Sequence, residues 1–143
     1  MIGLIVTGHG KFATSLQSAL ELIAGAKEEI EFVDFDCDSV TELDTRLKAA
    51  VDRLEKTDSI LALCDLTGGS PFKTMAMISN TLDKKVEIIG GVNLPILIEL
   101  TLARQFIEDL EQLTTMGIQT GKDNIIRFEL PKPTIREDDG DGI

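Results

Sequence analysis

The chain has 143 residues, a length that suits one domain with a single hydrophobic core. Hydrophobic residues make up 43% of it, which excludes a disordered chain, and no apolar run reaches the roughly 18 residues of a membrane-spanning helix. The 25 acidic and 14 basic residues give a net charge of −11, which argues against nucleic acid or an anionic membrane surface as a partner.

The cysteine and histidine content argues against both a metal site and a set of disulfide bonds. Cys37 and Cys64 lack metal-ligand spacing, and the single histidine, His9, cannot complete a zinc site with them. So few cysteines are typical of a reducing compartment, which predicts a cytoplasmic protein. No basic segment precedes the apolar run Ile2–Val6, so we expect a strand there rather than a signal peptide.

Short apolar runs alternate with helical stripes along the chain. Strands are predicted over Ile2–Val6, Ile30–Phe35, Ile60–Cys64 and Val86–Ile89. Helices are predicted from Phe12 to Gly25, from the capping box Ser39–Glu42 to Leu54, from the N-cap Ser70 with Pro71 in the first helical position, and from about Pro95 to Leu113. This alternation predicts an α/β three-layer sandwich around a mainly parallel sheet, with right-handed crossovers.

The C-terminal part differs from the rest. Ile125–Leu130 follows a predicted turn over 121–124 and alternates apolar with polar residues, as an edge strand does. The sequence therefore predicts one domain over 1–130 and an irregular tail over 131–143. The tail is acidic, carrying Glu137, Asp138, Asp139 and Asp141.

Two loops stand where ligands bind in such sheets, beyond the carboxyl ends of strands. The first, Thr7–Lys11, carries His9 between two glycines, just before a helix. The ordinary alternative is a surface histidine in a turn, but this location favours a functional one. If the strand order is 2-1-3-4, the loop that begins at Asp65 lies beside it, and Asp65 can hold one imidazole nitrogen while the other remains a nucleophile.

The second loop, Asp65–Phe72, is rich in glycine and leads into a helix. Its free N–H groups suit a phosphate, and the candidate phosphate-binding residues are Thr67, Gly68, Gly69 and Ser70. A tight turn with a helix cap explains Ser70 and Pro71 but leaves the Asp65 loop unexplained. A nucleophilic histidine, an orienting carboxylate and an anion cradle together indicate phosphoryl transfer through phosphohistidine, with no metal and no cofactor.

Three other patterns compete with this interpretation. Gly8–Ala13 matches the dinucleotide fingerprint Gly-x-Gly-x-x-Gly/Ala, with Asp34 about 20 residues later, but the match is short and ignores the Asp65 loop. Gly10 and Lys11 do not form a P-loop, because Ile5 and Phe12 replace its required glycine and hydroxyl residue. Asp34, Asp36 and Asp38 are expected to be solvated loop acids rather than a cation site.

The residues of three segments carry a family resemblance: Ile2–Gly10, Asp65–Phe72 and Gly90–Glu99. In order and spacing they resemble the IIA component of the mannose-family sugar phosphotransferase system, over almost the whole chain to about residue 128. The resemblance implies a sheet of order 2-1-3-4, and an antiparallel strand, here 125–130, exchanged in a homodimer.

The resemblance also implies roles and partners. His9 would take a phosphoryl group from phospho-HPr and pass it to the IIB component, Asp65 would orient it, and the turn from Thr67 to Ser70 would bind the phosphoryl oxygens. The membrane components IIC and IID would be reached through IIB. Lys73 departs from the family pattern, and the tail after Pro131 matches nothing in it. The phosphocarrier subunit of dihydroxyacetone kinase and a non-transferring regulatory module remain the alternatives.

Overall fold

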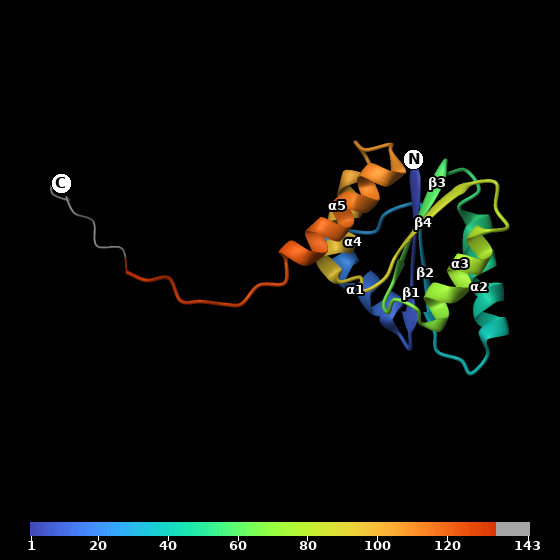
Figure 1. The fold of residues 1–143 in the computed structure, drawn as a ribbon, viewed down its shortest axis with the longest axis horizontal. Helices are drawn as coiled ribbons and strands as arrows, with labels where there is room; N and C mark the ends of the chain where they lie inside the picture. The colour runs from blue at the N-terminus through green and yellow to red at the C-terminus, as the bar shows by residue number, and fades with distance from the viewer. Residues whose placement is uncertain (134–143) are drawn as a thin grey trace.

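The computed structural model describes residues 1–133, in which strands and helices alternate until two helices follow the last strand. Four parallel strands form one sheet in the order β2-β1-β3-β4, which confirms the predicted fold class (Figure 1). The strands are β1 Ile2–His9, β2 Ile30–Phe35, β3 Ser59–Cys64 and β4 Lys85–Ile89. The helices are α1 Phe12–Ala24, α2 Val40–Arg53, α3 Ser70–Ser79, α4 Leu94–Ala103 and α5 Leu110–Asp123.

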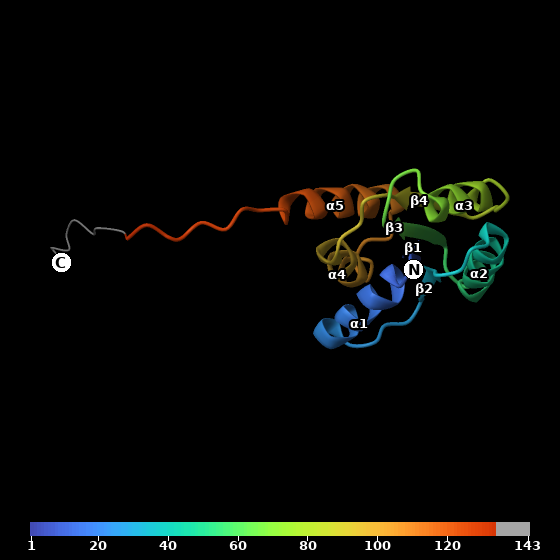
Figure 2. The ribbon, with the colours of Figure 1, turned by 90° about the horizontal axis from the view of Figure 1, so that it is seen from below.

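Helices cover both faces of the sheet and give three layers (Figure 2). α1, α4 and α5 lie on one face, and α2 and α3 lie on the other. Successive side chains of a strand point to opposite faces, so the central strands β1 and β3 are buried on both sides and read as continuous apolar runs. The first face contains Leu4, Val6, Leu20, Leu97 and Leu113, and the second contains Ile5, Leu43, Leu47, Met75 and Ile78.

Helix α2 begins as its sequence predicts. The Ser39 hydroxyl accepts the backbone N–H of Glu42 at 3.2 Å and so caps the first turn. Helix α1 ends as predicted at its C-terminus. Gly25 follows its last residue with a φ of 77°, a conformation that glycine adopts without a steric penalty. Local signals thus fix these two helix ends.

The predicted long helix from about Pro95 to Leu113 is wrong, because the chain interrupts it after Ala103. A new helix, α5, begins after Asp109, whose carboxylate accepts the Gln112 N–H at 2.7 Å. Apolar residues recur at helical spacing on both sides of this cap. Apolar periodicity alone therefore does not show where α4 ends and α5 begins.

Helix α5 also continues to Asp123, so residues 121–123 are helical where a turn over 121–124 is predicted. Its glycines are required by packing on α4 rather than by a turn. A Cβ atom on Gly117 would lie 2.9 Å from Cδ1 of Leu100, and one on Gly121 would lie 2.4 Å from Cδ1 of Ile96. The close approach of the two helices therefore explains why glycine stands inside α5.

Residues 125–133 have no regular secondary structure and run away from the body of the molecule (Figure 1). The antiparallel edge strand predicted for Ile125–Leu130 is not formed within the described residues. Its apolar side chains are instead at least 78% exposed, namely Ile125, Ile126, Phe128 and Leu130. The four acidic residues assigned to the tail lie outside the described residues. Among residues 1–133, no helix has the length and apolar character needed to cross a bilayer.

A buried arginine joins the turn after α4 to the opposite end of the sheet from the strand-ending loops. Arg104 is 5% exposed, and its guanidinium donates hydrogen bonds to the carbonyls of Ile2 at 3.0 Å, Glu29 at 2.8 Å and Glu28. Burial lowers its pKa from the ordinary value, while Glu29 opposes this. Arg104 thus ties α4 to the start of β1 and to the segment before β2.

We expect Arg104→Ala to lower the free energy of unfolding by about 3 kcal/mol, because it removes a buried guanidinium together with its three hydrogen bonds to backbone carbonyls. Urea denaturation measures the change. Arg53→Ala is the matched control, since Arg53 pairs with Glu31 at 2.7 Å but is 55% exposed and its loss should cost about 1 kcal/mol at most. Equal costs for the two variants would contradict the role of Arg104.

Candidate functional site

His9 and Asp65 meet at the carboxyl edge of the sheet. His9 is the last residue of β1, which is longer than predicted, and Asp65 directly follows β3. Since β1 and β3 are parallel neighbours, their ends lie side by side. The contact expected between the two residues is present, with 2.8 Å between Nδ1 of His9 and Oδ2 of Asp65.

One carboxylate oxygen holds both the backbone and the ring of His9. Oδ2 of Asp65 also accepts the backbone N–H of His9 at 2.8 Å, while Oδ1 is buried and has no hydrogen-bond partner within residues 1–133. The Asp65 side chain is 16% exposed and that of His9 is 46% exposed. The arrangement fixes Nδ1 as the donor nitrogen and leaves Nε2 without a hydrogen bond in the described part of the chain.

Gly8 allows the carboxylate to come this close to β1. A Cβ atom on Gly8 would lie 2.5 Å from Cδ1 of Phe12 and 2.8 Å from Cγ of Asp65. Any larger residue would therefore displace the aromatic ring or the carboxylate. Glycine stands at position 8 because the site leaves no room there for a side chain.

The loop after Asp65 brings backbone groups next to the imidazole. Gly68 has a φ of 80°, and a Cβ atom on Gly69 would lie 2.9 Å from Cε1 of His9. Gly69, rather than the predicted Ser70, is the N-cap of α3. Ser70 is already helical and makes no side-chain cap. The N–H groups of Gly68 and Ser70 have no acceptor within residues 1–133, so they can bind an anion.

Thr67 packs closely against the loop after β4. A Cβ atom on Gly90 would lie 2.1 Å from Oγ1 and 2.8 Å from Cα of Thr67. The loop after β3 therefore rests directly on the first glycine after β4, and Thr67 itself is exposed. Of the residues predicted to bind phosphate, Gly69 has no room for a Cβ atom beside His9, and Thr67, Gly68 and Ser70 are its neighbours in the same loop.

Neither cysteine belongs to this site. Burial, together with the Asp65 carboxylate, raises the pKa of the Cys64 thiol to about 12. It is therefore protonated at neutral pH and is not a nucleophile. Cys37 lies on the loop between β2 and α2, with its sulfur 3.5 Å from the carbonyl oxygen of Ser39.

The dinucleotide interpretation requires a free Asp34 carboxylate. Instead, the two carboxylate oxygens of Asp34 accept the backbone N–H of Thr14 at 3.0 Å and its hydroxyl at 2.6 Å. Thr14 lies in the first turn of α1, so Asp34 satisfies the start of that helix. In this structure the Asp34 carboxylate therefore already accepts two hydrogen bonds from α1.

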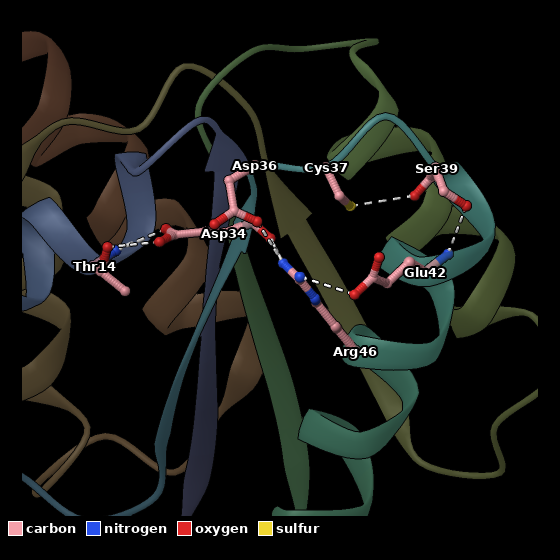
Figure 3. A network of polar contacts seen from close by, with 7 residues as sticks. All are labelled: Thr14, Asp34, Asp36, Cys37, Ser39, Glu42 and Arg46. Carbon is pink, nitrogen blue, oxygen red and sulfur yellow. Dashed lines mark hydrogen bonds and ion pairs between the residues drawn. The ribbon is translucent and has the colours of Figure 1, made fainter.

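Of the three acids expected to be solvated loop residues, Asp36 and Asp38 lie on the loop after β2 and are exposed, whereas Asp34 lies outside that loop. Asp34 belongs to β2, and Asp36 pairs with Arg46 at 2.7 Å (Figure 3). The Arg46 guanidinium holds the pKa of Asp36 below its usual value, and it also binds Glu42 at 2.9 Å. Within residues 1–133, no three side chains of the metal-binding types gather closely enough to hold a metal ion.

Phe35 is a neighbour of His9 that sequence reasoning missed. It is the last residue of β2 and stands opposite His9 in the register of the parallel pair. The two ring centroids are 5.7 Å apart, with 57° between the ring planes. The predicted strand ends at Val6, so His9 is not expected to pair with a residue of β2. The pairing arises because β1 continues to His9.

A comparison with known protein families finds a match over most of the chain. The model of the family EIIA-man, described as "PTS system fructose IIA component", matches residues 3–123. This range contains the five helices and, apart from Ile2, the four strands of the described residues, together with both loops of the site.

Two curated relatives differ in how much of their length is matched. The mannose-specific EIIAB component of the PTS system of Escherichia coli K12 is 30% identical over 126 residues, which is 87% of this chain but 38% of that protein. The chain thus spans well under half of this relative. The fructose-specific EIIA component of Bacillus subtilis 168 is 25% identical, and the match covers 97% of this chain and 99% of that protein.

Solved structures show the same fold. A phosphotransferase system component EIIA from Streptococcus agalactiae superposes with a TM-score of 0.82 at 32% identity, covering 89% of this chain and 97% of that one. A mannose/sorbose-specific IIA subunit from Enterococcus faecalis superposes with a TM-score of 0.77 at 25% identity, with coverages of 92% and 98%.

Proposed function

The chain belongs to the mannose-type EIIA family of the sugar phosphotransferase system, and we propose that it is a phosphoryl carrier that accepts its phosphoryl group on His9. The donor is phospho-HPr and the acceptor is a IIB component. One observation carries the proposal: Asp65 binds Nδ1 of the only histidine and leaves Nε2 open at the protein surface.

The chemistry follows from the tautomer that this contact selects. With the Nδ1 proton donated to Asp65, Nε2 carries the lone pair that attacks phosphorus. A nitrogen–phosphorus bond forms as the bond between the phosphoryl group and HPr breaks. The imidazole gains positive character in this step, and the Asp65 carboxylate stabilises it at 2.8 Å. Transfer to IIB reverses the same steps.

The loop beside His9 supplies the site for the phosphoryl oxygens. The N–H groups of Gly68 and Ser70 have no acceptor in residues 1–133, and they stand at the start of α3, where the helix dipole favours an anion. Thr67 and Ser70 are the hydroxyl-bearing residues of the same loop. Gly69 lets this backbone lie against the imidazole ring.

The surface around His9 suits a protein partner. Leu66 is 57% exposed directly after Asp65, and Phe72 is half-buried on α3. Two other apolar residues close to His9 or Asp65 in sequence are less available, since Met75 is fully buried and Phe12 packs against the core. We therefore assign the HPr contact to Leu66 and Phe72, with the net charge of −11 favouring a basic patch on HPr.

The wider assembly follows the family. The IIB component receives the phosphoryl group and connects the carrier, in the cytoplasm, to the membrane components IIC and IID. We further propose a homodimer in which Ile125–Leu130 adds to the sheet of a second copy, since these apolar side chains are exposed in the single chain. Sedimentation of the full chain measures the oligomeric state.

Phosphorylation by phosphoenolpyruvate, enzyme I and HPr tests the proposed function. We expect one acid-labile phosphoryl group per chain, found by alkaline peptide mapping on the peptide that contains His9. Omission of HPr is the control and should give no incorporation. An unmodified chain in the presence of active HPr would instead favour the regulatory module or the dihydroxyacetone kinase branch, in which the fold serves another donor.

We expect Gly90→Ala to slow phosphoryl acceptance about tenfold, because the new methyl group would displace Thr67 and shift the loop beside His9. The initial rate of phosphorylation at fixed phospho-HPr measures the effect. A thermal unfolding midpoint close to that of the unmodified chain shows that the fold persists. An unchanged rate would mean that the position of Thr67 does not matter for the reaction.

A further inference from the structure

Three neighbours surround the His9 imidazole. Asp65 binds Nδ1, Gly69 lies against Cε1, and the ring of Phe35 packs against it at a centroid distance of 5.7 Å. A single hydrogen bond at Nδ1 leaves the ring free to turn, because the terminal torsion of histidine is broad. The orientation of Nε2 therefore depends on the packing neighbours as well as on Asp65.

Phe35 is itself held in place. Its carbonyl oxygen accepts the backbone N–H of Gly10 at 2.8 Å, which closes the backbone just after His9. Its side chain packs against the core cluster under α2 and α3. The ring thus presents a fixed surface to the imidazole, on the same face of the sheet.

The residues on both sides of Phe35 are anchored to different helices (Figure 3). Asp34 binds Thr14 of α1, while its carbonyl oxygen accepts a hydrogen bond from Arg46 of α2 at 3.2 Å. Asp36 pairs with the same guanidinium at 2.7 Å. Hydrogen bonds therefore hold the end of β2, on both sides of Phe35, to helices of both layers.

From this geometry we infer that Phe35 is a positioning residue for phosphoryl transfer. Its ring limits rotation of the His9 imidazole, so that the Nδ1–Asp65 contact persists and Nε2 faces the incoming phosphoryl group. The inference rests on the proposed function of His9. It assigns to Phe35 an effect on the rate of transfer and no effect on the binding of HPr.

Three variants of the full chain test this role. Phe35→Leu removes the aromatic surface, and Phe35→Tyr keeps it. Phe32→Leu is the matched control, since Phe32 lies on the same strand but packs against the core cluster on the opposite face. Urea denaturation of each variant measures any general loss of stability.

Two measurements are made on each variant. The first is the rate of phosphorylation as a function of phospho-HPr concentration, which separates kcat from KM. The second is the nitrogen-15 spectrum of the imidazole, which is readily assigned because the chain has one histidine. For Phe35→Leu we expect kcat to fall about tenfold at unchanged KM, and the Nδ1 and Nε2 shifts to move toward each other as the tautomer becomes mixed.

Phe35→Tyr and Phe32→Leu should resemble the unmodified chain in both measurements. The inference is overturned if Phe35→Leu matches Phe32→Leu, if only KM changes, or if either the rate or the spectrum stays unaltered. Should the unmodified chain accept no phosphoryl group, the proposed function fails and the transfer role of Phe35 fails with it. The spectra then still decide whether Phe35 holds the ring.

Discussion

We expect His9→Ala to accept no phosphoryl group from phospho-HPr, because it removes the only imidazole of the chain. No other residue of the site replaces it, since the Cys64 thiol stays protonated at neutral pH. The measurement is incorporation of labelled phosphate from phosphoenolpyruvate in the presence of enzyme I and HPr. Labelling of the variant at the level of the unmodified chain would contradict the assignment of His9.

The fold of His9→Ala should remain intact. The His9 side chain is 46% exposed at the end of a strand, and the hydrogen bond from the backbone N–H of residue 9 to Asp65 does not depend on it. We expect the free energy of unfolding to change by about 1 kcal/mol or less. A cooperative urea transition therefore distinguishes loss of the nucleophile from loss of structure.

We expect Asp65→Ala to slow phosphoryl acceptance roughly 100-fold without abolishing it. The nucleophile remains, but Nδ1 loses its acceptor, so the tautomer is no longer fixed and the positive imidazole is no longer stabilised. Single-turnover phosphorylation by excess phospho-HPr gives the rate. The site of modification should still be His9.

The control for Asp65→Ala is Asp38→Ala, which removes the same side chain from an exposed loop. It lowers the net negative charge by the same amount, so it reports any general effect of charge on HPr binding. We expect its rate to match that of the unmodified chain. Equal slowing in both variants would assign the effect to net charge rather than to the contact with His9.

Several local patterns in the sequence predict the structure well. Continuous apolar runs locate the central strands β1 and β3, since a buried strand in a parallel sheet has apolar side chains on both faces. The edge strands β2 and β4 are located by shorter apolar stretches that also contain acidic residues. The Ser39 cap and Gly25 mark helix ends, because their effect depends on groups a few residues away. The contact between His9 and Asp65 follows from strand order, which brings the ends of β1 and β3 together.

Errors arise where tertiary packing outweighs the local pattern. Apolar periodicity continues across the break between α4 and α5, so it predicts one helix where Asp109 begins a second. Gly121 suggests a turn, yet it lies in α5 because Ile96 leaves no room for a side chain. The alternation of Ile125–Leu130 indicates a strand, but a strand also needs a neighbouring edge, and within residues 1–133 none pairs with it.

The α/β class, the order in which strands and helices occur and the two loops that carry His9 and Asp65 all follow from the amino-acid sequence. These depend on burial periodicity, caps and turn residues, which are local properties of the chain. Three contacts become visible only in the folded chain: Phe35 packs beside His9, Thr67 lies against Gly90, and Asp34 accepts hydrogen bonds from the start of α1. Those contacts join residues far apart in sequence, and they depend on strand register and on the close packing of loops.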